Sequence, residues 1–469
     1  MLFLSIKNLT LPLPKCDGVE LRLDMLSKIN KEEINTFCKK INLPIIFTLR
    51  KSTQGGHFNG IEEKRLKIIE DLLTINPTFL DLEYDTNHDF IKKIREKFPL
   101  IKIIISYHNF ENTPENLEEI LQSIETPLAY SYKIATMATS TLDALRMLLF
   151  VKNKKNLSAI CMGEYGEITR ILGPVFSTFI DYTYVEEPTA LGQLSFKELI
   201  EIYHYNTLTP STKLYGVIGD PVDKTLSYHA HNAVNAQWNS VYVKMRIKKE
   251  ELFSFFQLAK KCNFSGLSVT MPLKEAVLPF LDVDDDAKKI GAVNTIKFQW
   301  EKILGYHTDG KGALDALEEK TKVKGKKIII LGAGGAARAI IFEALKRGAN
   351  VTILNRTKGK AQMLAEIFGC LGDGLEALKD QNYDIIINTT PSPLPIDPKY
   401  FMPNAIAMDV KNRPKMTIFL QEAAKKGLSL VYGYEMFFNQ AIEQCKIWDM
   451  PVGEKEFKTK GYEKVAKLL

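Results

Sequence analysis

Short apolar runs alternate with amphipathic segments along the first part of the chain, up to about residue 185. The runs are rich in Ile, Leu and Val and have strand length, whereas segments such as Ile61–Leu73 and Ser140–Val151 repeat apolar residues at helical spacing. About eight strands alternating with helices over roughly 200 residues predict a closed (β/α)8 barrel. The predicted strands are Leu2–Ile6, Val19–Leu23, Ile45–Leu49, Thr78–Glu83, Ile101–Ser106, Ala129–Ile134, Leu157–Cys161 and Phe179–Tyr184.

The connection after the first predicted strand breaks this alternation. Pro12 and Pro14 lie between Lys7 and Asp17, and a proline inside a helix removes a backbone donor and clashes with the preceding turn. We therefore expect the first βα unit to lack its helix.

A second α/β pattern begins at Lys213, after the polar stretch Tyr203–Ser211, which we interpret as a linker. Further on, the strand KKIIIL leads directly into GAGGAARAIIFEAL and then into the strand NVTIL, an order typical of a Rossmann dinucleotide-binding unit. The chain is thus predicted to be an α/β protein with a (β/α)8 barrel followed by a two-lobed α/β dehydrogenase that contains a Rossmann domain. The predicted bounds are 1–205 for the barrel, 212–310 with the folded-back helices of 435–469 for a substrate-binding lobe, and 311–434 for the Rossmann domain.

The composition fits a multidomain globular protein that handles small anions. At 469 residues the chain exceeds one ordinary core, and its 45% hydrophobic and 25% charged residues are a usual balance. The net charge is +6, but Lys and Arg form no runs with interleaved aromatic residues. This pattern argues against nucleic-acid binding and suits anionic metabolites better.

No motif predicts a metal site, a disulfide framework or a membrane segment. The six cysteines are scattered, and none forms Cys-x-x-Cys or lies at metal-ligand spacing from a histidine. The opening MLFLSIKNL is too short for a signal peptide, and no apolar run approaches the roughly 18 residues of a membrane helix. We expect a cytoplasmic protein with free thiols and no metal.

Polar residues lie in or just after several predicted barrel strands. Barrel enzymes build their sites at the carboxyl ends of the strands, so these side chains are expected to converge. A neutral lysine amine in an apolar barrel attacks carbonyls to form a Schiff base, and arginines hold a carboxylate. His108 is expected to titrate near neutrality and so to move protons. Lys133 alone or His108 alone fits a structural role better than a functional one; taken together with the arginines, the set favours a keto-acid site. The set comprises Glu20, Arg22, Arg50, His108, Lys133, Arg170, Thr189 and Gln193.

The motifs ELRLD, FTLR before a GG pair, SYHNFENTP, YKIA, MGEYGEITRILGPVF and EEPTALGQLS resemble type I 3-dehydroquinate dehydratase over about residues 1–200. The resemblance implies that Lys133 condenses with the substrate ketone and that His108 removes the C2 proton and helps to expel the C1 hydroxyl. The remaining six residues would bind the substrate hydroxyls and carboxylate. Two positions depart from the family pattern: Gln54 stands for a usual Glu, and Thr189 for a usual Ser.

The second half offers another cluster of chemistry. The Gly-rich turn at Gly332 follows a strand and opens a helix, which suits a pyrophosphate, and Arg356 after the next strand favours a 2′-phosphate over a free ribose hydroxyl. Thr225 and Ser227 offer hydroxyls to a carboxylate. Lys274 and Asp309 could handle the proton that accompanies hydride transfer, although each alone could be a solvated charge.

GVIGDPVDKTLSYHAHN, SVTMPLK, IGAVNT, GYHTDG, LGAGGAARA, NRT and GYEMFFNQA resemble shikimate dehydrogenase over about residues 213–469. The resemblance implies a catalytic pair, Lys274 and Asp309, and NADP(H) as the cofactor. Departures include His307 for a usual Asn, Tyr228 for a Pro, NTTPSP for an NATS-type segment, and Lys411 for a Tyr. By the resemblance, Thr225, Ser227, Thr270, Asn294 and Gln440 bind shikimate, and Gly332, Gly334, Gly335, Ala336, Asn355, Arg356, Thr357, Gly433 and Met436 hold NADP(H).

Together the two resemblances predict one bifunctional enzyme, since the product of the first reaction is the substrate of the second. Its partners would be small-molecule substrates, with no nucleic acid and no membrane. One alternative is that the second half prefers quinate. Another, from a different class, is a catalytically silent sensor of the same metabolites, which would not need Lys133, His108, Lys274 and Asp309 all intact.

Overall fold

The structure is a computed structural model that describes all 469 residues. By its internal contacts the chain divides into two compact units, Met1–Lys213 with Asn239–Asn263, and Leu214–Trp238 with Phe264–Leu469. None of the helices combines the length and apolar character that a membrane crossing requires. No group of three or more His, Cys, Asp and Glu side chains is placed to hold a metal ion.

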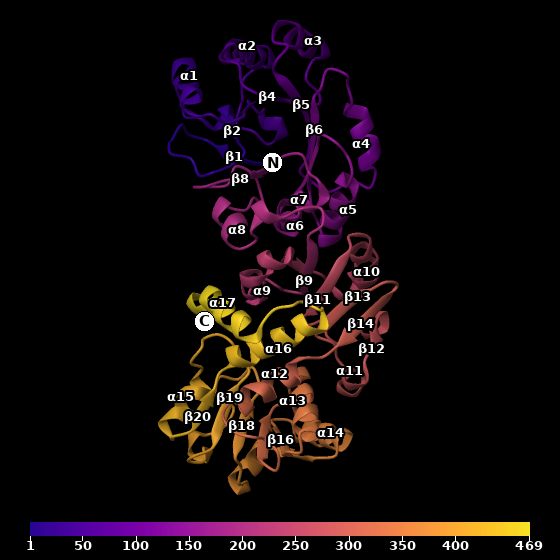
Figure 1. The fold of residues 1–469 in the computed structure, drawn as a ribbon, viewed down its shortest axis with the longest axis vertical. Coiled ribbons are helices and arrows are strands. Elements are labelled where there is room, and N and C mark those ends of the chain that lie inside the picture. Colours follow the sequence, from indigo (N-terminus) through magenta and orange to yellow (C-terminus); the bar gives the residue numbers. More distant parts are fainter. The chain divides into compact units, whose positions relative to one another are not determined.

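Eight parallel strands form the sheet of the first unit in the order β7-β6-β5-β4-β3-β2-β1-β8 (Figure 1). This sheet confirms the predicted (β/α)8 barrel. The barrel is nearly closed, because β8 has only three residues and forms no ladder with β7. The hydrogen bond from Phe179 N to Leu157 O, 2.9 Å long, spans this seam. The strands are β1 (Leu2–Ile6), β2 (Gly18–Arg22), β3 (Ile45–Thr48), β4 (Phe79–Glu83), β5 (Lys102–Asn109), β6 (Ser131–Met137), β7 (Leu157–Met162) and β8 (Asp181–Thr183).

Helices follow every barrel strand except β1, as the prolines of that connection predicted. The Asp17 carboxylate, which accepts a hydrogen bond from Leu2 N at 2.8 Å, ties the connection back to β1 instead. Figure 1 shows α1 to α5 around the outside of the strands. The helices are α1 (Lys31–Lys40), α2 (Glu62–Leu72), α3 (His88–Lys97), α4 (Leu117–Ile124), α5 (Thr141–Val151), α6 (Glu167–Ile171), α7 (Gly173–Phe176) and α8 (Phe196–Glu201), and the unit also contains β10 (Ser240–Arg246) and α10 (Leu252–Lys261).

One end of the barrel interior is filled with apolar side chains. Phe3, Ile46, Phe79 and Ile104 pack there, and the Phe3 and Phe79 rings meet edge to face with centroids 6.1 Å apart. These residues lie in the amino-terminal halves of their strands. The carboxyl ends are therefore left to the polar residues, which is the side where barrel enzymes place their sites.

The second unit contains two sheets. In the first, β9, β11, β13, β14 and β12 lie in that order, with β13 antiparallel to both neighbours. In the second, all strands are parallel and lie in the order β17-β16-β15-β18-β19-β20, which is the Rossmann order. The chain builds the sheet outward in one direction from β15 to β17 and in the other from β18 to β20, and ligands of such sheets bind where the direction changes, between β15 and β18. The strands are β9 (Lys213–Gly219), β11 (Phe264–Val269), β12 (Asp282–Val283), β13 (Thr295–Gln299), β14 (Lys302–Tyr306), β15 (Lys327–Leu331), β16 (Asn350–Asn355), β17 (Leu371–Gly374), β18 (Ile385–Asn388), β19 (Ile406–Asp409) and β20 (Ser429–Val431).

Close helix packing in this unit depends on two glycines. A Cβ on Gly312 would lie 2.6 Å from Gln440 N, and one on Gly310 would lie 2.2 Å from Ala339 O, so α12 can approach α16 and α13 closely. The C-terminal helices, yellow in Figure 1, pack back onto the unit, with α17 against α9. The helices are α9 (Ser227–Asn235), α11 (Asp285–Ile290), α12 (Asp309–Glu318), α13 (Gly335–Lys346), α14 (Lys358–Phe368), α15 (Ile418–Lys425), α16 (Gly433–Ile447) and α17 (Glu454–Val465).

Candidate active sites

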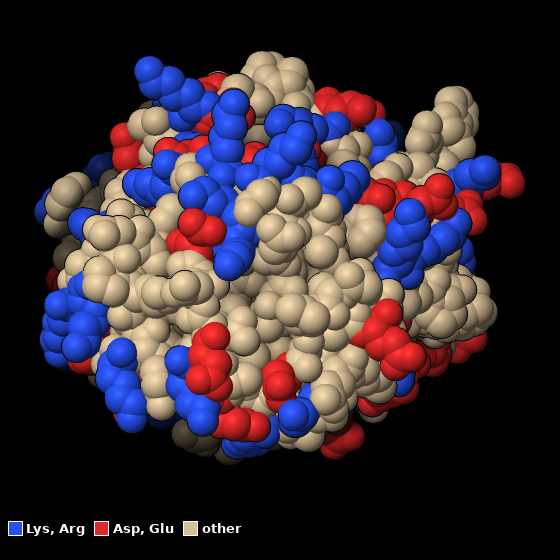
Figure 2. Space-filling view, turned by 90° about the horizontal axis from the view of Figure 1, so that it is seen from below, with Lys and Arg blue, Asp and Glu red and all other residues tan.

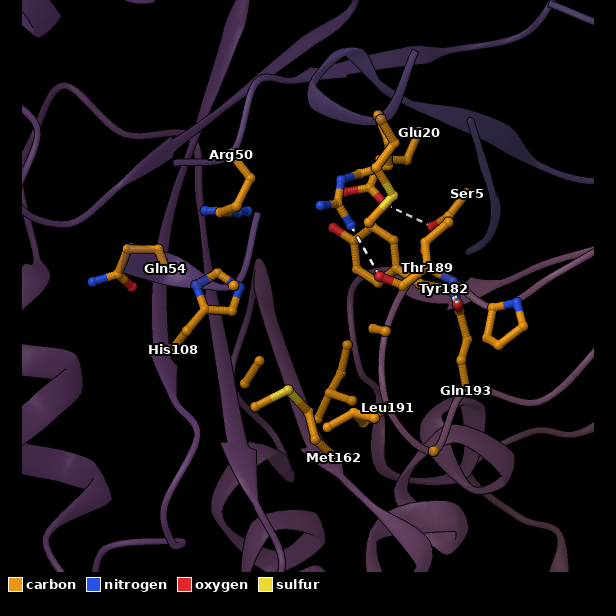
Figure 3. A pocket seen from close by; sticks show the side chains of 18 of the residues that line it. Ser5, Glu20, Arg50, Gln54, His108, Met162, Tyr182, Thr189, Leu191 and Gln193 are labelled. Atoms are coloured by element: carbon orange, nitrogen blue, oxygen red, sulfur yellow. Dashed lines mark hydrogen bonds between the residues drawn. The ribbon is translucent and has the colours of Figure 1, made fainter. Parts of the chain in front are cut away.

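A cavity of about 750 Å3 opens at the polar end of the barrel and brings together all eight residues that the sequence singled out there (Figure 3). Glu20 and Arg22 both reach it from β2, as expected for side chains two residues apart on one strand. Arg170 lies on α6, and Thr189 and Gln193 lie in the long connection after β8. The eight residues are Glu20, Arg22, Arg50, His108, Lys133, Arg170, Thr189 and Gln193.

Lys133, the third residue of β6, is almost fully buried in this cavity. The sequence interpretation assumed apolar surroundings for Lys133, but the structure places charged groups beside it. The Lys133 Nζ lies 3.4 Å from Asp81 Oδ2 and 3.6 Å from Glu20 Oε1, and 4.2 Å from the ring centroid of Tyr182. Glu20 is itself held by Ser5 Oγ at 2.5 Å. Two fixed carboxylates and a ring face therefore surround the Lys133 amine before a substrate binds.

Asp81 is the residue of this site that the sequence analysis missed. It is fully buried on β4, where it accepts hydrogen bonds from Arg50 Nη2 at 2.8 Å and from Ser106 Oγ at 2.7 Å. Burial alone would raise the pKa of Asp81, but Arg50 and Lys133 lower it below its ordinary value. The signal was present, since alternate residues of FLDLE are charged in an otherwise apolar strand.

His108 lies near the end of β5, and the Gln54 side chain lies beside it in the cavity wall (Figure 3). Burial, together with the charges of Arg50 and Lys133, lowers the pKa of His108 well below its ordinary value. The expectation that this imidazole titrates near neutrality is therefore wrong for the free site, where it is neutral. Neither His108 Nδ1 nor Gln54 Oε1 has a hydrogen-bond partner, so both remain available to a ligand or to each other.

The arginines differ in how much of their donor capacity is already used. Arg22 is held by Asp24 at 2.7 Å and by Thr189 O at 3.2 Å. Arg170 Nη2 donates to Leu191 O at 3.1 Å, but its buried Nε has no partner. Burial lowers the pKa of Arg170 to about 10, so the guanidinium remains charged at neutral pH. Arg170 can thus receive a carboxylate without first losing an ion pair.

In the second unit, Lys274 and Asp309 form a close ion pair through Nζ and Oδ2. Asn294 Nδ2 donates to Asp309 Oδ1 at 2.7 Å, and Asn294 and Thr308 bond each other and approach Gln440 Oε1 at 3.5 and 3.4 Å. Burial would raise the pKa of Asp309, but Lys274 and His307 hold it at about 2. The network joins the loop after β11, the start of α12 and the middle of α16.

His307 is an unexpected neighbour of this pair. Its side chain is fully buried, Nε2 lies 3.8 Å from Asp309 Oδ2, and neither ring nitrogen has a hydrogen-bond partner. Burial lowers the pKa of His307 to about 4 against the opposing charge of Asp309, so the ring is neutral near pH 7. A neutral imidazole at this place can donate to or accept from the Lys274–Asp309 pair or a ligand.

The other residues expected to bind substrate lie around β9 and β11. Thr225 and Ser227 form a hydroxyl pair, with their oxygens 3.0 Å apart, where α9 begins. Thr270 follows β11 directly, and its amide donates to Ile218 O on β9 at 2.9 Å. Both positions are at carboxyl ends of neighbouring parallel strands, where ligand sites of α/β sheets occur.

The Gly-rich turn lies at the point where the Rossmann strand order reverses. Gly332 has a φ of +112°, and a Cβ there would lie 2.5 Å from Thr389 Oγ1, so glycine is required. Above Gly334 and Gly335 the space is open, since a Cβ on either residue would have no other atom within 4 Å. Gly335 begins α13, so main-chain amides face this open space at the positive end of a helix. The turn therefore fits a pyrophosphate.

Positive charge is available beside this turn. Arg356, just after β16, is exposed and has no acidic partner, whereas Lys358 is paired with Asp373 at 2.7 Å. Figure 2 views the Rossmann end of the second unit and shows Lys and Arg side chains gathered over its upper part. At the start of α16, a Cβ on Gly433 would lie 2.2 Å from Lys411 O, and Met436 is buried one turn later. Asn355, Ala336 and Thr357 lie at these same strand ends and helix starts.

Fold and sites together define an enzyme of two active centres: a barrel with a buried lysine that can bond a carbonyl, and a Rossmann dehydrogenase with a lysine–aspartate pair. Three family models match consecutive parts of the chain: type I 3-dehydroquinase over residues 10–210, the shikimate dehydrogenase substrate binding domain over 217–296, and shikimate/quinate 5-dehydrogenase over 315–419.

Relatives match the chain as a whole. The chloroplastic bifunctional 3-dehydroquinate dehydratase/shikimate dehydrogenase of Arabidopsis thaliana is 35% identical, over 92% of this chain and 77% of that protein. The shikimate biosynthesis protein AroDE of Chlamydia pneumoniae is 34% identical, over 92% and 90%. The structure of Thermus thermophilus shikimate 5-dehydrogenase in complex with NADP(H) and shikimate is 30% identical with a TM-score of 0.51, over 54% of this chain and 100% of that one.

The chain belongs to the family of bifunctional 3-dehydroquinate dehydratase/shikimate dehydrogenases. It is thus a lyase and an oxidoreductase of the shikimate pathway on one polypeptide, which confirms the main functional prediction from the sequence.

Proposed function

We propose that the barrel dehydrates 3-dehydroquinate to 3-dehydroshikimate and that the second unit reduces this product to shikimate with NADPH. The observation that carries the proposal is the presence of two separate lysine sites, one around the buried Lys133 and one around the partly buried Lys274, each with a proton-transfer partner. The domains we propose are 1–205 for the dehydratase, 212–310 with 435–469 for shikimate binding, and 311–434 for NADP(H) binding. The second of these includes Asn239–Asn263, which the internal contacts group with the first unit.

In the barrel, the Lys133 amine attacks the carbon of the substrate ketone, and the ketone oxygen leaves as water with one proton from the former ammonium and one from the attacking nitrogen, which yields a protonated Schiff base. The neutral His108 accepts the C2 proton and returns it to the C1 hydroxyl, which leaves as water. Hydrolysis of the Schiff base then releases the product and regenerates the amine. The unpaired Arg170 Nε supports a role in holding the substrate carboxylate, and the remaining polar residues of the cavity would bind its hydroxyls.

Changing Gln54 to glutamate is expected to move the acidic limb of the dehydratase pH profile upward by about one pH unit. A carboxylate beside His108 favours the imidazolium and so raises the pKa of this base, which must be neutral to accept a proton. Activity below neutrality should fall. The measurement is kcat/KM against pH, with Gln54→Leu as a matched control that adds no charge. An unchanged limb in the Gln54→Glu variant would show that residue 54 does not tune His108.

In the dehydrogenase, the Lys274 ammonium donates the proton that neutralises the oxygen formed when the ketone is reduced. Asp309, ionised at neutral pH, holds this ammonium, and Asn294 holds Asp309. Thr225, Ser227, Thr270 and Gln440 would bind the hydroxyls and carboxylate of the substrate. NADPH, when bound, supplies the hydride; the open glycine turn would receive its pyrophosphate, and Asn355, Arg356 and Thr357 its 2′-phosphate.

Replacing Arg356 by alanine is expected to raise the KM for NADPH about 10- to 100-fold, because one hydrogen-bonded charge pair contributes a binding free energy of that size. The KM for NADH, which lacks the 2′-phosphate, should hardly change. Lys358→Ala provides a control, because that lysine is already occupied by Asp373. An equal change for both cofactors would place Arg356 away from the 2′-phosphate.

The experiment that tests the whole proposal is NADPH consumption by the purified chain supplied with 3-dehydroquinate alone. Consumption requires both sites to work in sequence, and 3-dehydroshikimate serves as the control substrate for the second site. Consumption on the control only would refute the proposed barrel reaction. Rates of NADP+ reduction with shikimate and with quinate decide which alcohol the second site prefers.

A further inference from the structure

The second unit contains a cavity of about 390 Å3 that neither proposed active site uses. It lies where the carboxyl end of α12, the first turns of α16 and the helix α17 meet. A volume of this size is within the usual range for small-molecule sites, roughly 300–1,000 Å3. Its walls consist of Glu319, Tyr434, Glu435, Phe438, Lys458 and Tyr462.

Aromatic rings form one continuous wall of this cavity. The Tyr434 ring centroid lies 5.4 Å from that of Tyr462 and 6.4 Å from that of Phe438, and the latter two are 6.4 Å apart. Phe438 is buried, whereas both tyrosines are half-exposed. Lys415 Nζ donates to Tyr462 Oη at 3.0 Å and lies over the rings of Tyr434 and Tyr462, 5.0 and 5.5 Å from their centroids. A planar ring could add to this cluster at ordinary aromatic spacing.

Opposite charges line the same cavity. Glu435 is half-buried, and one of its oxygens accepts from Tyr432 N at 2.7 Å, but no lysine or arginine lies within ion-pair distance. Burial accordingly raises the pKa of Glu435. The Lys458 ammonium lies 2.7 Å from Glu319 and 3.2 Å from Glu454, which leaves one of its three donors for a further acceptor. The cavity therefore offers a carboxylate that has no ion-pair partner within 4 Å, and an ammonium that is already paired with two carboxylates and keeps one N–H donor for a ligand.

We propose that this cavity binds an α-amino acid with an aromatic side chain. The ring would lie on the wall of Tyr434, Phe438 and Tyr462, the α-ammonium would pair with Glu435, and the α-carboxylate would meet Lys458. The ring, the α-ammonium and the α-carboxylate of such a ligand would each contact a complementary group of the cavity. A simple amine would leave the third donor of Lys458 unused, and a simple aromatic acid would leave Glu435 without an ion-pair partner.

The occupied cavity would also influence the dehydrogenase, because both share α16. Tyr434, Glu435 and Phe438 face the cavity, while Gln440 on the same helix approaches Asn294 and Thr308 beside Asp309. The close approach of α12 at Gly312 brings Gln440 on α16 into direct contact with the helix that begins at Asp309. A ligand that forms an ion pair with Glu435 would therefore displace α16, shift Gln440 on the same helix and alter the KM of the dehydrogenase for 3-dehydroshikimate. This consequence rests on the proposed dehydrogenase site, whereas the binding itself does not.

Titration calorimetry of the full chain with L-phenylalanine, without substrates or NADPH, tests the binding. We expect saturable binding that weakens about tenfold in Glu435→Gln and in Lys458→Met. The introduced amide oxygen would still accept from Tyr432 N, so Glu435→Gln removes charge and keeps the helix cap. The matched control is Lys460→Met, which removes an exposed lysine two residues away that is paired with Glu456.

Ligand analogues sharpen the result. L-Alanine lacks the ring, 2-phenylethylamine lacks the carboxylate, and 3-phenylpropionate lacks the ammonium, so each should bind at least about tenfold more weakly than L-phenylalanine. Absence of binding up to the solubility limit would overturn the proposal, as would equal binding of 3-phenylpropionate or an equal loss in Lys460→Met. The calorimetry measures no catalysis, so a negative binding result would not contradict the proposed function. A negative NADPH assay, in turn, would not contradict the proposed binding of an aromatic amino acid.

Discussion

Replacing Lys133 by methionine is expected to lower the dehydratase kcat at least about 10,000-fold, the scale of loss when a catalytic nucleophile is removed. Methionine keeps the length of the side chain but has no amine to bond the ketone. Asp81 keeps Arg50 as a partner at 2.8 Å, so the site should not collapse. The measurement is the ultraviolet absorbance of the conjugated product, together with NADPH-dependent reduction of 3-dehydroshikimate, which should be unaffected.

Borohydride provides an independent readout for the same residue. Reduction in the presence of 3-dehydroquinate should attach substrate-derived mass to the peptide that contains Lys133 in the unmodified chain and leave the Lys133→Met chain unlabelled. Lys155→Met, a change at an exposed lysine, serves as the control and should be labelled normally. Labelling of the Lys133→Met chain at another lysine would assign the Schiff base elsewhere.

Replacing Lys274 by methionine is expected to lower the dehydrogenase kcat by about 100- to 10,000-fold, the usual contribution of a positioned general acid. The loss should appear in kcat more than in the KM for NADPH, because the ammonium meets the reacting oxygen and not the cofactor phosphates. Dehydration of 3-dehydroquinate by the same sample reports that the chain is folded. Steady-state kinetics with 3-dehydroshikimate and NADPH give both constants.

The control for this change is Lys289→Met, which removes an exposed lysine of α11. It should keep full activity. If Lys274→Met retained more than about a tenth of the activity, the proton would have to come from another group. His307, whose free ring nitrogens lie beside Asp309, would then be the candidate, and a change in the pH profile of His307→Asn would identify it.

The two enzymes of this chain could be found from its sequence because their motifs are local. The strands of the barrel, the missing first helix and the Gly-rich turn depend on residues a few positions apart, such as Pro12 and Pro14 or the glycines from Gly332 onward. Residue spacing on a strand also predicted that Glu20 and Arg22 share a face. These features depend on backbone sterics and periodicity, which act within a segment.

The electrostatics of the sites could not be found in this way. Asp81 meets Arg50 and Lys133 only because β4 lies between β3 and β5 in the barrel, and this contact gives Lys133 a charged setting instead of an apolar one. His108 is neutral because its pKa is lowered by burial and by the charges of Arg50 and Lys133, two residues far from it in the sequence. The length of β8, which leaves the barrel nearly closed, likewise emerged only from strand pairing.

The sequence by itself therefore determined the order of the folds, the family and the two reactions, because short-range patterns and motif residues specify them. Only the tertiary structure decided which charges face one another, where His307 is buried and that α12, α16 and α17 enclose a second cavity. The physical reason is that burial and Coulomb interactions depend on distances through space between segments far apart in the chain, which no local pattern records.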